Sequence, residues 1–217
     1  MAASGGHTRV GVLGGTFDPV HLGHVAAAEG AARTLGLSRV IIVPAGVNPH
    51  KPVGPKAAAA DRLAMARLAV EGVAGLEVSD VETRREGPSY TVDTVRELAR
   101  EEGAGTGIFF LLGTDALRDL PTWRDVEGIF RVAEPAVVER PGAGEIDWEA
   151  LSRSLPGDVA RRARANVVRL ERGIDVSSTE VRRRLAAGES VAGLLAPGVE
   201  LYIREHGLYG ATPTESQ

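Results

Sequence analysis

The segment RVGVLGGTFDPVHLGHV, residues 9–25, joins two different hydrophobic patterns within a short stretch of chain. Val10–Leu13 is a continuous apolar run, which is typical of a buried strand. Leu22–Leu35 carries apolar side chains at helical spacing. We therefore predict a strand, a glycine-containing loop and a helix, which is the beginning of a unit that builds parallel sheets.

The alternation of strands and helices continues along the chain. Further strands are predicted at Arg39–Pro44, Leu76–Val81, Ile108–Leu112, Ala133–Val138 and Asn166–Leu170. Further helices are predicted at Ala57–Glu71, Tyr90–Glu102, Asp158–Ala165, Val181–Ala187 and Val199–His206, with loops at Pro44–Lys56 and Pro141–Ser154. We therefore predict an α/β fold: a Rossmann-like, doubly wound parallel sheet with helices on both faces and a small C-terminal helical portion.

Length and composition limit the class of protein. The 217 residues suit one domain, which we expect over residues 8–209, with flexible tails at 1–7 and 211–217. The absence of cysteine excludes disulfides, thiolate metal sites and a cysteine nucleophile. A net charge of −4 and only 4% aromatic residues argue against a nucleic-acid partner. Neither an export signal nor a membrane-spanning run is visible, so we expect a cytoplasmic protein without a membrane partner.

Gly14-Gly15-Thr16 follows the first predicted strand, where ligands bind in doubly wound sheets. Glycines at such a position let backbone N–H groups approach phosphate oxygens, and the following helix start adds partial positive charge. The spacing is not G-x-G-x-x-G, and no G-K-[ST] follows. The sequence therefore disfavours a dinucleotide-dependent dehydrogenase and a P-loop kinase.

His21 and His24 stand three residues apart at the start of the predicted helix, so their rings are expected on the same side. There they can donate hydrogen bonds to a phosphate chain, and the helix dipole favours the anion. A zinc site is the alternative, but it would need a third ligand from few remaining histidines. A purely structural role is the other alternative.

A second candidate anion site lies far downstream, at VSSTEVR, residues 176–182. Ser177 and Glu180 have the spacing of a capping box, which predicts a helix start with a solvated arginine face. Free N–H groups, hydroxyls and Arg182 also make this helix start suitable for phosphate. Arg183 and Arg184 are assigned to solvent or to structure.

These motifs resemble a known family. GGTFDPVHLGH, residues 14–24, resembles the signature of the nucleotidyltransferase superfamily with its T/H-x-G-H motif, and residues 176–182 resemble I-S-[SA]-T-x-x-R. Further segments resemble the nicotinate-nucleotide adenylyltransferase family: Asn48–Pro52, Pro88–Thr94, Gly113–Asp115, Pro121–Trp123, Arg140–Gly142 and Gly207–Tyr209. The resemblance spans residues 10–209, although Ala45–Asn48 departs from the usual pattern.

The resemblance implies transfer of AMP from ATP to nicotinate mononucleotide, giving deamido-NAD and pyrophosphate in NAD biosynthesis. It implies His21, His24 and Arg182 as catalytic residues. It implies ATP binding by Gly14, Gly15, Thr16, Phe17, His21, His24, Gly113, Asp115, Ser177, Ser178, Thr179 and Arg182. Mononucleotide binding would involve Thr16, His50, Lys51, Tyr90, Thr91, Asp115 and Trp123. The implied cofactor is Mg²⁺, held mainly by ATP phosphates and water rather than by a protein metal site.

Several of these residues have a second interpretation. Asp115 can accept hydrogen bonds from ribose hydroxyls or cap a helix, and Trp123 can stack on a pyridine ring or fill the core. Arg140 and Gly207–Tyr209 are predicted to be structural. The same chemistry on nicotinamide mononucleotide or phosphopantetheine is the alternative activity, and an inactive nucleotide sensor is the alternative class. A homo-oligomer is compatible with the sequence, which does not specify the oligomeric state.

Overall fold

The computed structural model describes residues 8–47, 54–140, 142, 144–170 and 176–211. Its six strands form one sheet in the order β3-β2-β1-β4-β5-β6, and all neighbouring strands run parallel. The strands are β1 (Arg9–Gly15), β2 (Arg39–Pro44), β3 (Leu76–Val78), β4 (Gly107–Gly113), β5 (Glu134–Glu139) and β6 (Val167–Arg169). The predicted doubly wound parallel sheet is therefore confirmed.

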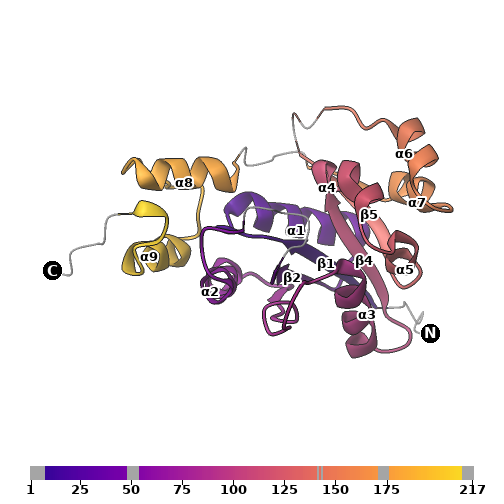
Figure 1. Cartoon of the computed structure of the whole chain (residues 1–217), viewed down its shortest axis with the longest axis horizontal. Helices are drawn as coiled ribbons and strands as arrows, with labels where there is room; N and C mark the ends of the chain where they lie inside the picture. The colour runs from indigo at the N-terminus through magenta and orange to yellow at the C-terminus, as the bar shows by residue number, and fades with distance from the viewer. Residues whose placement is uncertain (1–7, 48–53, 141, 143, 171–175, 212–217) are drawn as a thin grey trace, which may run out of the picture.

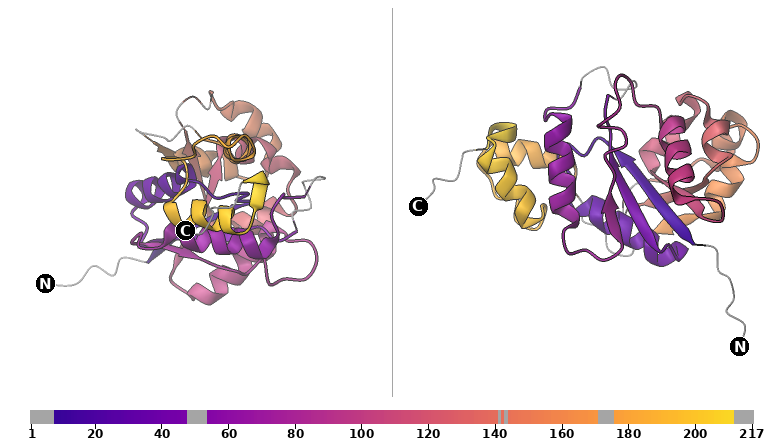
Figure 2. Two further views of the ribbon diagram at one scale, coloured as in Figure 1. Left: turned by 90° about the vertical axis from the view of Figure 1, so that its left-hand side faces the viewer. Right: turned by 90° about the horizontal axis from the view of Figure 1, so that it is seen from below.

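Helices cover both faces of this sheet (Figures 1 and 2). One hydrophobic cluster involves α1 (Leu22–Leu35), α2 (Ala59–Val70), α8 (Ser178–Ala186) and α9 (Pro197–Glu205). The other involves α3 (Thr91–Glu102), α4 (Thr114–Asp119), α5 (Val126–Phe130), α6 (Trp148–Ser154) and α7 (Val159–Ala165). Two short 3₁₀ turns, η1 (Leu120–Thr122) and η2 (Leu208–Gly210), follow α4 and α9.

The strand order places a crevice beside the end of β1. The chain proceeds from β1 to β2 and β3 on one side, then crosses back to β4, which pairs with β1 on its other side. Because β1 and β4 belong to opposite halves of the sheet, their carboxyl ends form the position where such folds bind ligands. Residues that follow Gly15 and Gly113 therefore face one another across this crevice.

Some boundaries differ from the sequence prediction. β1 continues through Gly14 and Gly15, which pair with Val43 and Pro44 of β2, so these glycines end the strand rather than begin a loop. The segment Pro141–Ser154, predicted as a loop, contains α6; the Asp147 carboxylate accepts the N–H of Ala150 at 2.9 Å and caps this helix. That prediction was wrong because the segment lacks a long apolar period, although a local cap and packing against α7 suffice.

The C-terminal portion packs on the rest of the chain. α9 lies against α2, as Figure 1 shows at the C-terminal end of the molecule. Val199 and Ile203 of α9 are fully buried, and Ala211, predicted to begin a flexible tail, is itself only 5% exposed. Residues 1–7 and 212–217, the rest of the predicted tails, lie outside the described residues. A single domain over residues 8–209 stays a prediction.

The Ile203→Ala variant tests whether the C-terminal helices unfold with the sheet. Removal of this fully buried side chain should lower the free energy of unfolding by about 2–5 kcal/mol. Urea unfolding, followed by both circular dichroism and tryptophan fluorescence, should still show one transition. Leu201→Ala on the same helix removes a side chain that is 51% exposed and serves as the control. Two separate transitions, with only the first displaced by Ile203→Ala, would contradict a single domain.

Candidate active site at the end of the first strand

The two histidines of the β1–α1 segment form a stacked pair. His21 is the N-cap residue of α1, and the rings of His21 and His24 lie 3.7 Å apart at 22°. The Nδ1 atom of His24 accepts the backbone N–H of His21 at 3.2 Å, so the neutral ring carries its proton on Nε2. The prediction that both rings lie on the same side of the helix start is confirmed.

Both rings are neutral at neutral pH. Burial is the main cause that lowers the pKa of His21 to about 4, and the nearby charge of Arg140 adds to the effect. Burial also lowers the pKa of His24, and electrostatic interactions with His21 and then Arg140, which disfavour a second positive charge here, add to the effect. Each neutral imidazole keeps one N–H group. The pair, which lies beside a helix N-terminus and an arginine, can therefore donate hydrogen bonds to an anion without being protonated to imidazolium. Arg140, predicted to be structural, thus contributes positive potential to this site.

The two glycines at the end of β1 have different packing constraints. A Cβ atom on Gly15 would meet the ring of Phe17 at 2.9 Å, whereas one on Gly14 would only touch the ring of Phe110 at 3.8 Å. Phe17 has a φ of 49°, and its buried ring packs edge-on against His24 at 4.9 Å. Gly15 is therefore needed for the packing that supports His24, and the exposed Gly14 suits close approach by a ligand.

The start of α8 lies directly beside this segment. The Ser178 hydroxyl donates to the carbonyl of Pro19 at 2.9 Å, and Arg182 donates to the carbonyl of Asp18 at 2.6 Å. Ser177 caps α8, as its Oγ accepts the N–H of Glu180 at 3.1 Å. The structure therefore brings together the two predicted anion sites, which are far apart in sequence.

The arginines that follow Arg182 face elsewhere. Arg183 pairs with Glu180 and Glu189, and Arg184 pairs with Glu180. Glu180 therefore binds arginines and supplies only its N–H to the predicted capping box. The structural assignment of Arg183 and Arg184 is consistent with these ion pairs.

A cavity of about 390 Å³ lies between the carboxyl ends of β1 and β4. Seven residues predicted from the sequence line it: Gly14, Gly15, Thr16, Tyr90, Thr91, Asp115 and Trp123. They come from four separate segments of the chain, and the crevice at the strand reversal brings them together. The predicted residues His50 and Lys51 lie outside the described residues.

The walls of this cavity combine aromatic and polar groups. Trp123 packs edge-on against Phe110, with ring centroids 6.1 Å apart. Tyr90 is the N-cap residue of α3, whose first residue is Thr91, and no side chain caps the N–H groups there. The Asp115 side chain is 95% exposed and pairs with Arg118 at 3.0 Å, while Gly113 is the N-cap of α4. Asp115 is therefore not a helix cap, and its carboxylate lies at the rim of the cavity.

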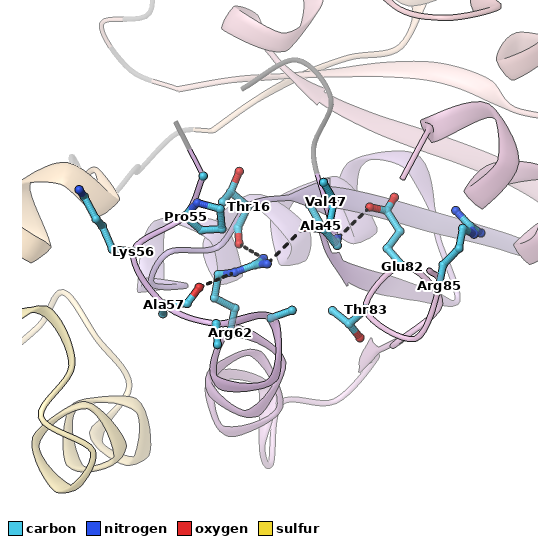
Figure 3. Close-up of a pocket in the computed structure, with 14 residues that line it drawn as sticks. Thr16, Ala45, Val47, Pro55, Lys56, Ala57, Arg62, Glu82, Thr83 and Arg85 are labelled. Atoms are coloured by element: carbon cyan, nitrogen blue, oxygen red, sulfur yellow. Dashed lines mark hydrogen bonds between the residues drawn. The ribbon is translucent and has the colours of Figure 1, made fainter. Parts of the chain in front are cut away.

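A second cavity of about 560 Å³ adjoins the first and shares Thr16, Ala45 and Glu82 with it. Figure 3 shows Arg62 extending from α2 toward the segment that follows β1. This side chain is 1% exposed and donates to the carbonyls of Thr16 at 2.8 Å, Ala57 at 3.3 Å and Gly46 at 3.4 Å. Arg62 therefore connects the site loops to α2.

Glu82 is the second buried charged residue at this boundary. Its carboxylate accepts the hydroxyl of Thr94 at 2.9 Å and the N–H of Gly46 at 3.4 Å, and burial raises its pKa. Neither Arg62 nor Glu82 was predicted from the sequence. Arg62 could have been found, because it shares the i, i+3, i+4, i+7 face of α2 with the buried Met65, Ala66 and Ala69.

Two further features bear on the predicted partners. Among the residues that the structure describes, no group of three or more His, Cys, Asp or Glu side chains is arranged to hold a metal ion. In the same part of the chain, no helix has the length and apolar character required to cross a membrane.

The lowered pKa of His21 predicts a pH-dependent stability. The unfolded chain protonates this ring near pH 6.5 and the folded chain only near pH 4, so the unfolded state binds more protons between these values. The stabilisation is complete above pH 6.5 and decreases as the pH falls toward 4, by up to about 1.4 kcal/mol per pH unit for one proton. His24 acts in the same direction.

Urea unfolding between pH 7.5 and 4.5 measures this dependence. The His21→Gln variant should show a smaller decrease in stability across this range than the wild type, once both are shown to be folded at pH 7.5. Parallel pH profiles for the two proteins would contradict the assignment of a neutral, buried His21.

The sheet topology and the two helix starts that adjoin the end of β1 suit an α/β protein of the nucleotidyltransferase type. Comparison with known families agrees: the profile of the family described as Cytidylyltransferase-like matches residues 12–184, so the chain belongs to that family.

Relatives within this family are similar over nearly the whole chain. A protein of Chromobacterium violaceum named "Probable nicotinate-nucleotide adenylyltransferase" is 42% identical over 213 residues, covering 94% of this chain and 99% of that protein. A protein of the same name from Roseiflexus sp. is 44% identical, covering 92% and 97%. The structure of Plasmodium falciparum nicotinic acid mononucleotide adenylyltransferase complexed with NaAD has the same fold, with a TM-score of 0.74 and 18% identity over 94% of this chain and 98% of that one.

Proposed function

We propose that this enzyme transfers AMP from ATP to nicotinate mononucleotide and releases pyrophosphate and deamido-NAD. The observation that carries the proposal is the 390 Å³ cavity, in which Trp123, the start of α3 and the end of β1 meet. The two helix starts with His21, His24 and Arg182 adjoin the same strand end. The names of the relatives agree with this activity.

The acceptor's ring and carboxylate suit different walls of this cavity. The half-buried indole of Trp123 offers a flat face for stacking on a pyridine ring. The uncapped N–H groups at Tyr90 and Thr91, with the partial positive charge of α3, suit a carboxylate. An amide would place its NH₂ group against these donors, so the acid should be preferred. His50 and Lys51 stay predicted ligands of the mononucleotide phosphate.

ATP would lie across the histidine pair and the start of α8. We assign the α-phosphate and bridging oxygen to His21 and His24, with the backbone of residues 14–17 nearby. The departing β- and γ-phosphates are assigned to Ser177, Ser178, Thr179 and Arg182. Gly113, the last residue of β4, and Asp115, in the first turn of α4, are assigned to the ribose.

The chemistry requires no covalent enzyme intermediate. An oxygen of the mononucleotide 5′-phosphate attacks the α-phosphorus of ATP in line, and the bond from that phosphorus to the pyrophosphate oxygen breaks. The attacking phosphate is already ionised at neutral pH, so no general base is needed. This agrees with two neutral histidines that act as donors, since catalysis then rests on positioning and on charge stabilisation.

Mg²⁺ is the proposed cofactor, held mainly by the ATP phosphates and by water. The Asp18 carboxylate is occupied by the backbone N–H groups of Lys56 and Ala57 and by the Tyr209 hydroxyl, and Glu82 is occupied by Thr94 and Gly46. When bound, the ion would neutralise phosphate charge in the transition state. A cytoplasmic location and a homo-oligomer stay predictions.

Release of pyrophosphate with ATP and Mg²⁺ tests the proposed reaction. The acceptors are nicotinate mononucleotide, nicotinamide mononucleotide and phosphopantetheine, compared by kcat/KM. We expect the nicotinate form to be preferred about 10- to 100-fold over the amide, the size expected when donors are left without an acceptor. Equal use of both mononucleotides would contradict the carboxylate assignment. Turnover with phosphopantetheine alone would contradict nicotinate mononucleotide as the acceptor. Absence of turnover with all three compounds would contradict the proposed activity.

The Trp123→Ala variant tests the stacking wall. Loss of the indole should raise the KM for nicotinate mononucleotide about tenfold, while Trp123→Phe, which keeps an aromatic face, should lose less. Trp148→Ala is the control, because Trp148 packs on the same side of the sheet but does not line the 390 Å³ cavity. An unchanged KM in Trp123→Ala would show that the indole serves only the core.

A further inference from the structure

Asp18 joins three distant segments of the chain through one buried carboxylate. The side chain lies in the β1–α1 segment, and the residue is 6% exposed. Its Oδ2 atom accepts the N–H of Lys56 at 2.7 Å, and its Oδ1 atom accepts the N–H of Ala57 at 3.0 Å. The hydroxyl of Tyr209 donates to the same Oδ1 atom at 2.8 Å. The approach to α2 and the C-terminal turn η2 are thus fixed to the candidate phosphate site.

Asp18 also holds Arg182, mainly through its backbone carbonyl. The guanidinium of Arg182 donates to the backbone carbonyl of Asp18 at 2.6 Å and lies 3.9 Å from Oδ2. Its second nitrogen donates to the hydroxyl of Thr179 at 3.2 Å, and 27% of the side chain is exposed. Arg182 is therefore held in place while its charge stays accessible to an anion at the start of α8.

Tyr209 is held in an unusual conformation at this junction. Its φ of 58° and ψ of 22° lie in the left-handed region, which non-glycine residues rarely adopt. Burial and the bond to Asp18 raise the pKa of its hydroxyl, so it stays a donor at neutral pH. The described residues include one other tyrosine–aspartate bond of this kind, from Tyr202 to Asp61 at 2.9 Å, between α9 and α2.

We propose that Tyr209 is a positioning residue that keeps the charge of Arg182 available to the phosphates of ATP. The proposal rests on the proposed adenylyl transfer. A carboxylate has about four acceptor positions, and the Tyr209 hydroxyl occupies one of them. Without this hydroxyl, the Arg182 guanidinium, 3.9 Å from Oδ2, can move onto the carboxylate, whereas Arg62, whose charge also acts on Asp18, is already bonded to three backbone carbonyls. Arg182 would then close on Asp18, and its attraction for phosphate would decrease.

Tyr209→Phe removes the hydroxyl and keeps the ring. We expect the KM for ATP to rise about five- to twentyfold, the effect of a weakened charge-assisted contact, and the KM for nicotinate mononucleotide to change by less than about twofold. Tyr202→Phe is the matched control, because it removes a tyrosine–aspartate bond of the same kind without touching Asp18. Both variants should show similar small decreases in Tm. Equal KM values for ATP in the two variants would overturn the proposal.

A double-mutant cycle separates positioning from a general structural effect. If Tyr209 acts through Arg182, then Tyr209→Phe should weaken ATP binding little or not at all in an Arg182→Ala background. Affinities would be measured by calorimetry with a non-hydrolysable ATP analogue, so that the readout does not depend on turnover. Independent, multiplicative losses in the two backgrounds would overturn the proposal.

The same titrations distinguish failure of this inference from failure of the proposed function. If the wild type binds the analogue and Tyr209→Phe binds it equally well, the inference fails and the proposed function stands. If the wild type neither binds the analogue nor releases pyrophosphate from ATP, the proposed function fails and the inference fails with it.

Discussion

The parallel pairing of β1 with both β2 and β4 is the constraint on which the rest of the structure depends. Because β1 is central, its end is flanked by strands from opposite halves of the sheet, and a crevice opens there. Backbone pairing continues through Gly15, so the glycine pair is held by the sheet. The histidine pair, the 390 Å³ cavity and the contacts to α8 all adjoin this one strand end.

Around this strand end the protein buries charged groups that have bonded partners. Asp18, Arg62 and Glu82 are each less than a tenth exposed, and burial without partners would be costly for all three. Their partners are largely backbone N–H and carbonyl groups of the site loops. Removing one such charge would leave loop groups unsatisfied, so the same bonds that stabilise the fold also fix the loops before substrate arrives.

Much of the fold could be predicted because the residues on the buried faces of strands and helices are apolar and recur at regular spacings in the sequence. The strand Arg39–Pro44 matches its predicted bounds, and Leu22–Leu35 matches α1. The short helices α4, α5 and α6 were not predicted, since five to seven residues give only a weak apolar period. α7 is equally short but was predicted, because it consists largely of Ala and Arg, which favour helices. α8 begins at Ser178, as the capping-box spacing of Ser177 and Glu180 predicts, and not at Val181, where the apolar pattern alone places its start.

Local patterns of the sequence were enough to predict the class of chemistry. Glycines after a strand, two histidines at a helix start and a second capped helix with Arg182 are local patterns, and each describes an anion site without reference to the rest of the chain. Their assembly into one candidate site became visible only in the folded chain, because the contacts from Ser178 to Pro19 and from Arg182 to Asp18 join segments about 160 residues apart. The hydrogen bond from Tyr209 to Asp18 likewise could not be predicted from the sequence. Such pairings arise from the way the helices pack around the sheet, and no local periodicity of the chain encodes them.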